Sequence, residues 1–122
     1  MTTLVLNVPR PPMTANEQRR WHWRKVHRAK NEAETLVWVA ARAARIPTLT
    51  GKQAISVTWY APNAIRRDSD ALGPFLKASL DALVKCGVLA DDDSKHVRIA
   101  GLDIDLDRDR PRIEITITEE PS

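Results

Sequence analysis

Hydrophobic and polar residues alternate in three stretches of the chain, and this alternation predicts β-strands. The apolar members are Leu4, Leu6 and Val8 in the first stretch, Ile55, Val57 and Trp59 in the second (residues 53–61), and Ile113, Ile115 and Ile117 in the last. Three prolines, at positions 9, 11 and 12, end the first strand because proline cannot donate to a sheet ladder. Val97 and Ile99 indicate one further strand.

Two helices are predicted between these strands. Asn31 with Glu34 three residues later matches a capping box, so we expect a helix to begin there and to end before Pro47. Its expected buried face carries Ala33, Leu36, Val37, Ala40 and Ala44. The second helix is expected from Pro74 to Cys86, with Gly87 just past its end. Its stripe of Leu76, Leu80 and Leu83 lies opposite Lys77, Asp81 and Lys85.

The order β-α-β-α-β-β predicts an α+β fold in which a small mixed β-sheet packs against two helices. No internal repeat or linker interrupts the chain, so we expect residues 1–122 to form one domain. The sequence has no long apolar run and no signal-peptide pattern, and we expect a soluble, cytoplasmic protein. Cys86 is the only cysteine, which excludes an intrachain disulfide and a cysteine-based zinc cage; we expect a buried structural thiol.

Charge is distributed unevenly along the chain. Residues 1–60 contain ten Lys and Arg against three acids (+7), whereas residues 61–122 contain nine against thirteen (−4), giving the net charge of +3. A basic half can hold a polyanion, and an acidic half can hold metal ions. The sequence pI of about 9.4 is compatible with a nucleic-acid partner.

Seven of the ten Lys and Arg residues in this basic half lie in residues 10–30, where Glu17 is the only acid. Such a segment can neutralise phosphates without reading base sequence. The candidate DNA-binding residues are Arg19, Arg20, Arg24, Lys25 and Arg28, together with Arg66 and Arg67 farther along. Trp21 and Trp23 are candidates either for stacking on unpaired bases or for the core or a dimer contact. His22 and His27 are metal-ligand or phosphate-donor candidates, although nothing else zinc-like accompanies them.

Two groups of aspartates lie on either side of the second predicted helix: Asp68 with Asp70 before it, and Asp91–Asp93 after it. If the chain is extended at Asp68 and Asp70, both side chains point to one side, with Cα atoms roughly 6.5–7 Å apart. The Asp91–Asp93 run follows the second predicted helix and can return beside them. Such oxygen ligands suit Mg²⁺, and carboxylate-held metal ions can hydrolyse a phosphodiester. Lys77 is then a candidate positive charge for the transition state. Spacing alone leaves open a simple turn and a solvated acidic run.

Several short motifs follow one another along the chain. They are Arg66-Arg67-Asp68-Ser69-Asp70-Ala71-Leu72, Leu76-Lys77-Ala78, Leu80-Asp81-Ala82-Leu83, Gly87-Val88-Leu89, Asp91-Asp92, the N-terminal Val8-Pro9-Arg10-Pro11-Pro12 and the final Ile113–Glu119 strand. In this order they resemble the signature of the RusA-type Holliday junction resolvases. The resemblance covers most of the chain. Two departures are Ala71, where the family commonly has asparagine, and a longer Asp70-to-Lys77 interval.

The resemblance implies a homodimeric, Mg²⁺-dependent endonuclease (Mn²⁺ is possible) that resolves four-way DNA junctions by paired nicks, in recombination and repair. It places the metal ligands on Asp68, Asp70 and Asp92, with Asp91 adjacent, and the functional lysine on Lys77. Which member of the Asp91–Asp93 run faces the metal is left open by the sequence, because only alternate residues of an extended segment share a face.

Two other functions are compatible with the sequence. One is a non-catalytic, basic DNA-binding protein whose carboxylates only cap a helix. The other is a calcium-responsive module, since Asp103, Asp105, Asp107 and Asp109 followed by Glu114 partly match an EF-hand loop. Arg108 occupies the position of the required glycine, so we expect a solvated strand or hairpin edge there instead.

Overall fold

The computed structural model describes residues 1–120 as a mixed four-stranded sheet with three helices. The elements are β1 (Thr2–Leu6), α1 (Ala15–Arg20), α2 (Trp23–Ala43), β2 (Gln53–Ala61), α3 (Gly73–Lys85), β3 (Val97–Leu106) and β4 (Arg112–Glu119). The strand order is β1-β4-β2-β3. Strand β4 is antiparallel to both β1 and β2, whereas β2 and β3 are parallel, so the sheet is mixed as predicted.

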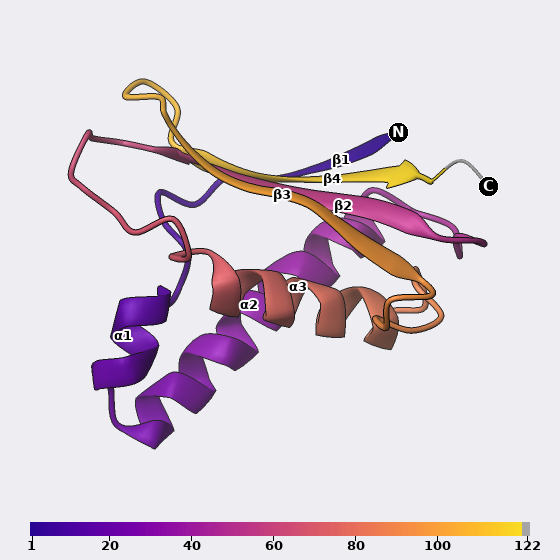
Figure 1. Ribbon diagram of the computed structural model, residues 1–122, viewed down its shortest axis with the longest axis horizontal. Helices are drawn as coiled ribbons and strands as arrows, with labels where there is room; N and C mark the ends of the chain where they lie inside the picture. The colour runs from indigo at the N-terminus through magenta and orange to yellow at the C-terminus, as the bar shows by residue number, and fades with distance from the viewer. Residues whose placement is uncertain (121–122) are drawn as a thin grey trace.

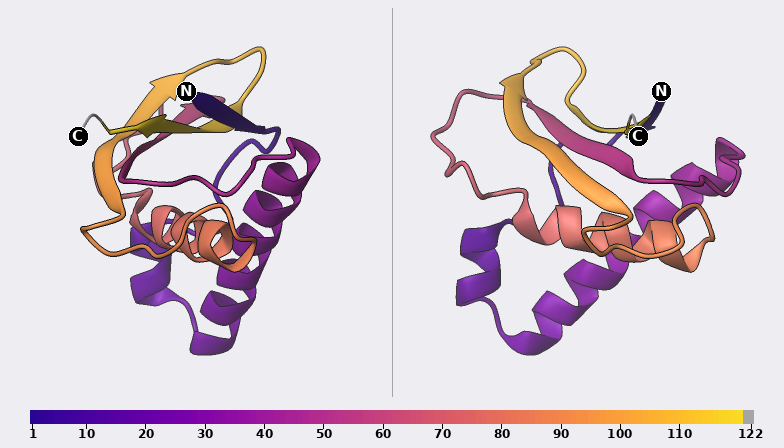
Figure 2. Two further views of the ribbon diagram at one scale, coloured as in Figure 1. Left: turned by 90° about the vertical axis from the view of Figure 1, so that its right-hand side faces the viewer. Right: turned by 45° about the vertical axis from the view of Figure 1, so that its right-hand side comes forward.

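One face of the sheet packs on α2 and α3, as Figures 1 and 2 show. The predicted alternation is confirmed in the two central strands. Ile55, Val57 and Trp59 of β2 are buried, as are Ile113, Ile115 and Ile117 of β4, and the residues between them are at least partly exposed. These side chains join those of α2 and α3 in one hydrophobic core. The fold class is therefore the predicted α+β.

The predicted start of the first long helix was wrong. Helix α2 begins at Trp23, eight residues before Asn31, and Asn31 lies exposed within it. The residues buried along α2 are Ala29, Ala33, Val37 and Ala41, a strict four-residue spacing that extends the apolar line back before Asn31. The predicted Ala44 is exposed and only caps the helix end.

Helix α1 was not predicted at all, although its start signal is present in the sequence. Thr14 and Glu17 form the capping box that begins it. Helix α1 is six residues long, too short for a recognisable apolar face, and buries only Ala15. It projects with the first half of α2 away from the sheet (Figures 1 and 2).

Helix α3 agrees closely with its prediction. Pro74 lies in its first turn, Leu80 and Leu83 are buried, and Gly87 follows the C-cap with a positive φ of 83°. Leu76 is only half-buried, and Phe75 takes the deeper position at 1% exposure. Cys86 is also half-buried rather than buried, because it lies at the helix end, where solvent reaches it.

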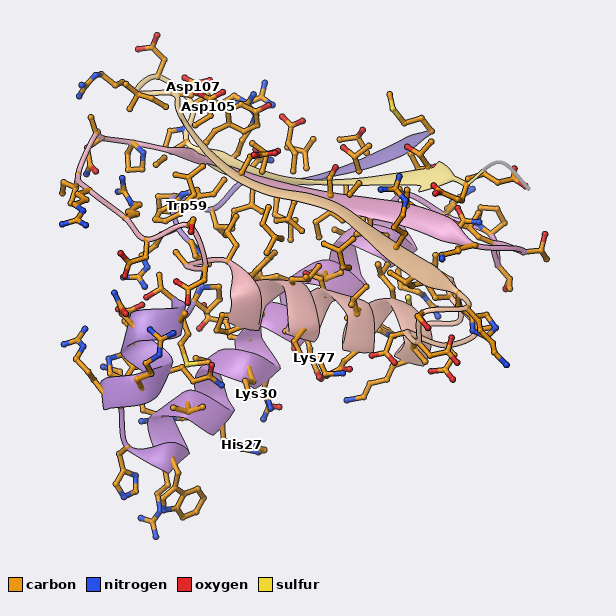
Figure 3. All side chains as sticks on the ribbon, in the orientation of Figure 1. His27, Lys30, Trp59, Lys77, Asp105 and Asp107 are labelled. Atoms are coloured by element: carbon orange, nitrogen blue, oxygen red, sulfur yellow. The ribbon has the colours of Figure 1, made fainter. Side chains whose placement is uncertain are left out.

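Strand β3 forms an exposed, acidic edge of the sheet. Asp103 and Asp105 lie exposed on it, and Asp107 and Asp109 follow in the turn before β4 (Figure 3 labels Asp105 and Asp107). This agrees with the solvated edge expected in place of a calcium loop. None of the helices described for residues 1–120 is both long and apolar enough to span a membrane.

Candidate functional site

A cleft of about 470 Å³ opens between α1 and the loop that joins β2 to α3. Four arginines and two aspartates contribute to its walls: Arg10, Arg20, Arg66, Arg67, Asp68 and Asp70. The remaining lining comes mainly from the Pro9–Glu17 segment, Trp59, Pro62 and Asn63. Two segments predicted separately for phosphate binding and for metal binding therefore meet in one cleft.

The wall formed by α1 is fixed by the capping box. The Thr14 backbone N–H donates to Glu17 Oε1 (3.0 Å), the Glu17 N–H donates to Thr14 Oγ1 (3.4 Å), and Arg10 pairs with the same carboxylate. Burial raises the pKa of Glu17, but the hydrogen bonds from Arg10 and Thr14 outweigh it, so the pKa lies below its ordinary value. The Ala15 N–H also donates to the Ala71 carbonyl (3.2 Å), which ties α1 to the turn carrying the aspartates.

Asp68 and Asp70 lie in consecutive turns, so the extended conformation considered for them is not adopted. The Asp68 carbonyl accepts from the Ala71 N–H (3.1 Å), and the Asp70 carbonyl accepts from the Gly73 N–H (2.9 Å) just where α3 begins. Both carboxylates have partners on α1: Asn16 Nδ2 donates to Asp68 (2.8 Å), and Arg19 donates to Asp70 (2.9 Å). Donors from α1 thus hold both carboxylates at this end of α3.

The opposite wall of the cleft is built around Arg67. Its guanidinium donates to the Asn63 and Ile65 carbonyls (3.0 and 2.8 Å) and to Asn63 Oδ1 (2.6 Å). It also lies 4.5 Å from the centroid of the Trp59 ring, whose Nε1 donates to the Pro9 carbonyl (3.0 Å). Of the two predicted loop arginines, Arg67 is therefore engaged in shaping the loop, while Arg66 is exposed at the cleft.

A second cavity, of about 330 Å³, adjoins the first through Asp70. It is lined by Lys30 of α2 and Lys77 of α3 among others (Figure 3 labels both lysines). Lys77 Nζ donates to Asp92 (2.9 Å) and lies 3.1 Å from Asp81. The hydrogen bonds to Asp92 and Asp81 raise the pKa of Lys77, and the hydrogen bond from Lys77 lowers the pKa of Asp92.

The Asp91–Asp93 run divides between two sets of contacts. Asp92 faces Lys77, whereas Asp91 and Asp93 lie with His96. The ring Nδ1 of His96 is 2.5 Å from Asp93 Oδ1, and this hydrogen bond lowers the pKa of Asp93. His96 was missed in the sequence, although its i,i+3 spacing from Asp93 was a visible signal.

Metal ions in proteins are commonly held by the side chains of His, Cys, Asp and Glu. Within residues 1–120, only one group of three or more of these side chains has its ligand atoms all within 4.8 Å of one another, and it consists of Asp91, Asp93 and His96. Asp68, Asp70 and Asp92 are therefore not gathered as tightly as the sequence interpretation expected. The sequence could not foresee this, because each of the three carboxylates has a donor from elsewhere in the chain: Asn16, Arg19 and Lys77, respectively.

The other five predicted DNA-binding cations lie on α1 and the first turns of α2. Arg19, Arg20, Arg24, Lys25 and Arg28 are all exposed. Apart from Arg19, which contacts Asp70, none of them takes part in an ion pair within the described part of the chain. Their charge therefore remains available to an external anion.

No protein-family model matches the chain, and no curated protein matches it.

Proposed function

We propose that the chain is a Mg²⁺-dependent, structure-selective endonuclease that resolves four-way DNA junctions by paired nicks, as its resemblance to the RusA-type resolvases implies. The observation that carries the proposal is the position of Asp68 and Asp70 in an arginine-lined cleft. Asp70 also borders the second cavity together with Lys77, which contacts Asp92. The carboxylates, the lysine and the phosphate-binding cations are thus contiguous.

The donor set fits a hard divalent cation. Asp68, Asp70 and Asp92 offer only oxygen ligands, which Mg²⁺ and Mn²⁺ accept. Their present partners are weak competitors, since the side chains of Arg19 and Asp70 are 61% and 56% exposed and that of Lys77 is 62% exposed. Exposed ion pairs of this kind contribute about 0–1 kcal/mol each to stability, so breaking them costs less free energy than the binding of a divalent ion can supply. Such an ion, when bound, supplies an activated water and neutralises charge at the phosphorus.

The chain's own residues have three roles in this proposal. Arg20 and Arg66 bind backbone phosphates at the cleft, because both are exposed there without a carboxylate partner within residues 1–120. Arg67 and Trp59 keep the loop in the shape that forms the wall. When Asp92 binds the metal ion, Lys77 keeps Asp81 as its ion-pair partner. Lys77 then holds a positive charge beside the scissile phosphate. A two-fold dimer then presents two such sites to two symmetric strands.

Replacement of a proposed ligand tests the site. Asp70→Asn keeps the side-chain shape but removes the charge, and we expect Mg²⁺-dependent nicking of a four-way junction to fall by more than about 100-fold. Junction binding is expected to be unchanged or tighter, because a charge that repels phosphate is lost. Asp103→Asn is the matched control, since Asp103 is an exposed aspartate on β3, away from both cavities. Equal nicking by Asp70→Asn and the wild type would refute the site.

One observation favours the second candidate, a non-catalytic DNA-binding protein: each of the three carboxylates already has a protein donor. That function predicts junction binding that is insensitive to chelator and no nicking of branched DNA by the wild type. The same assay therefore separates the two candidates.

A further inference from the structure

The corner between α1 and α2 combines exposed aromatic rings with positive charge. Trp23 is 67% exposed, and the guanidinium of Arg24 lies 5.3 Å from its ring centroid. Lys25 Nζ lies 4.1 Å from the ring centroid of Trp21, the residue directly after α1. His22, the N-cap of α2, lies between them, with its ring 5.6 Å from that of Trp23.

This surface is strongly basic. From Arg19 to Lys30 the chain has six Lys or Arg residues and no acid. The corner lies at the end of α1 and α2 farthest from the sheet (Figure 1), and Figure 3 marks His27 and Lys30 on the adjoining turns of α2. Arg20, which lines the large cleft, precedes Trp23 by three residues, a reach of at most about 11 Å. The corner and the cleft are therefore adjacent parts of one surface.

The exposure of Trp23 excludes the core position that its sequence permitted. The apolar residues that follow it on α2 turn inward: Val26 is half-buried and Ala29 is buried. The outer surface of this turn therefore has isolated rings among cations, rather than the continuous apolar face with which an amphipathic helix enters a membrane. Aromatic faces flanked by cations are the arrangement that binds unpaired bases, because rings stack on bases while cations hold the adjoining phosphates.

We propose that the α1–α2 corner, residues 21–25, binds unpaired nucleobases at the branch point of DNA, with Trp23 as the stacking ring and Arg24 and Lys25 on the flanking phosphates. The inference rests on the proposed function for its substrate, and it adds to that function a means of telling branched DNA from linear duplex. Bases in a continuous duplex are stacked on one another, so their faces are open to Trp23 only where the stack is interrupted.

The test compares Trp23→Ala and Trp23→Phe with Trp38→Ala on a four-way junction carrying 2-aminopurine at the branch point. Trp38 is the control because it lies on the same helix, is 41% exposed, and has Arg42 5.0 Å from its ring. We expect Trp23→Ala to weaken junction binding by about 10-fold to 100-fold with little effect on linear duplex. Trp23→Phe should recover most of the loss, and wild-type binding should quench the 2-aminopurine more than Trp23→Ala binding does. Circular dichroism shows whether each variant is folded.

Two results would overturn the inference: junction affinity of Trp23→Ala equal to that of Trp38→Ala, or Trp23-dependent binding to vesicles of anionic phospholipid with junction affinity unchanged. Nicking in Mg²⁺, measured on the same wild-type samples, keeps the two proposals apart. Nicking without a Trp23 effect rejects only the stacking role. A Trp23 effect without nicking rejects only the nuclease.

Discussion

Trp59→Phe should lower the stability of the protein by about 2 kcal/mol. The Trp59 side chain is 4% exposed, its Nε1 donates to the Pro9 carbonyl, and its ring faces the Arg67 guanidinium. Loss of the hydrogen bond costs about 1 kcal/mol. A smaller ring that leaves a gap and faces the guanidinium less well costs about 1 kcal/mol more. For a chain of this length, the melting temperature should fall by roughly 8 °C.

Urea unfolding followed by circular dichroism measures this change. If the slope of the unfolding free energy against urea concentration is the same in both proteins, a shift of the midpoint is a change in stability. Trp38→Phe is the matched control: Trp38 is 41% exposed, and its replacement should change stability by less than about 0.5 kcal/mol. Since Trp59 connects the Pro9 segment and the Arg67 loop, two walls of the cleft, Trp59→Phe should also weaken DNA binding. Equal destabilisation by the two variants would refute the anchoring role of Trp59.

Three further predictions concern α1, the cleft and Lys77. Glu17→Gln should lower the stability by about 1 kcal/mol at neutral pH. Because the folded-state pKa of Glu17 is depressed, the stability contributed by this carboxylate is present above its ordinary pKa of 4.5 and is lost as pH falls below it. The urea midpoints of the wild type and the variant should therefore converge in acid. Arg20→Ala should reduce the slope of log affinity against log salt by about 1, measured by fluorescence anisotropy with junction DNA, and an unchanged slope would contradict a phosphate contact. Lys77→Gln should leave stability within about 0.5 kcal/mol, since its ion pairs are exposed, yet lower nicking by roughly 10-fold to 100-fold; equal nicking would remove Lys77 from the site.

The strands were predictable because each alternation is local. Ile55 and Ile113 are buried because alternate side chains of a strand point to the same face of the sheet, and this two-residue periodicity is visible in the sequence. Helix boundaries were less predictable, since Asn31 with Glu34 and Thr14 with Glu17 are both capping-box patterns. Only the second begins a helix, because the line of buried residues at four-residue spacing extends α2 back before Asn31.

The candidate site was predictable in its composition but not in its contacts. Asp68 and Asp70 lie near each other because they are two residues apart in the sequence. The chain that follows α3 turns back and places Asp92 beside Lys77. Their partners Asn16 and Arg19 are more than fifty residues away in the sequence, so the pairings that hold the aspartates depend on tertiary packing that local patterns do not encode.

Cleavage of a synthetic four-way junction tests the central claim most directly. The wild-type protein is incubated with the junction and with a linear duplex of the same sequence, in Mg²⁺ or in EDTA. We expect paired nicks in the junction with Mg²⁺, and none in the linear duplex or in EDTA. An intact junction in Mg²⁺ at protein concentrations that bind it fully, or equal cutting in EDTA, would contradict the nuclease.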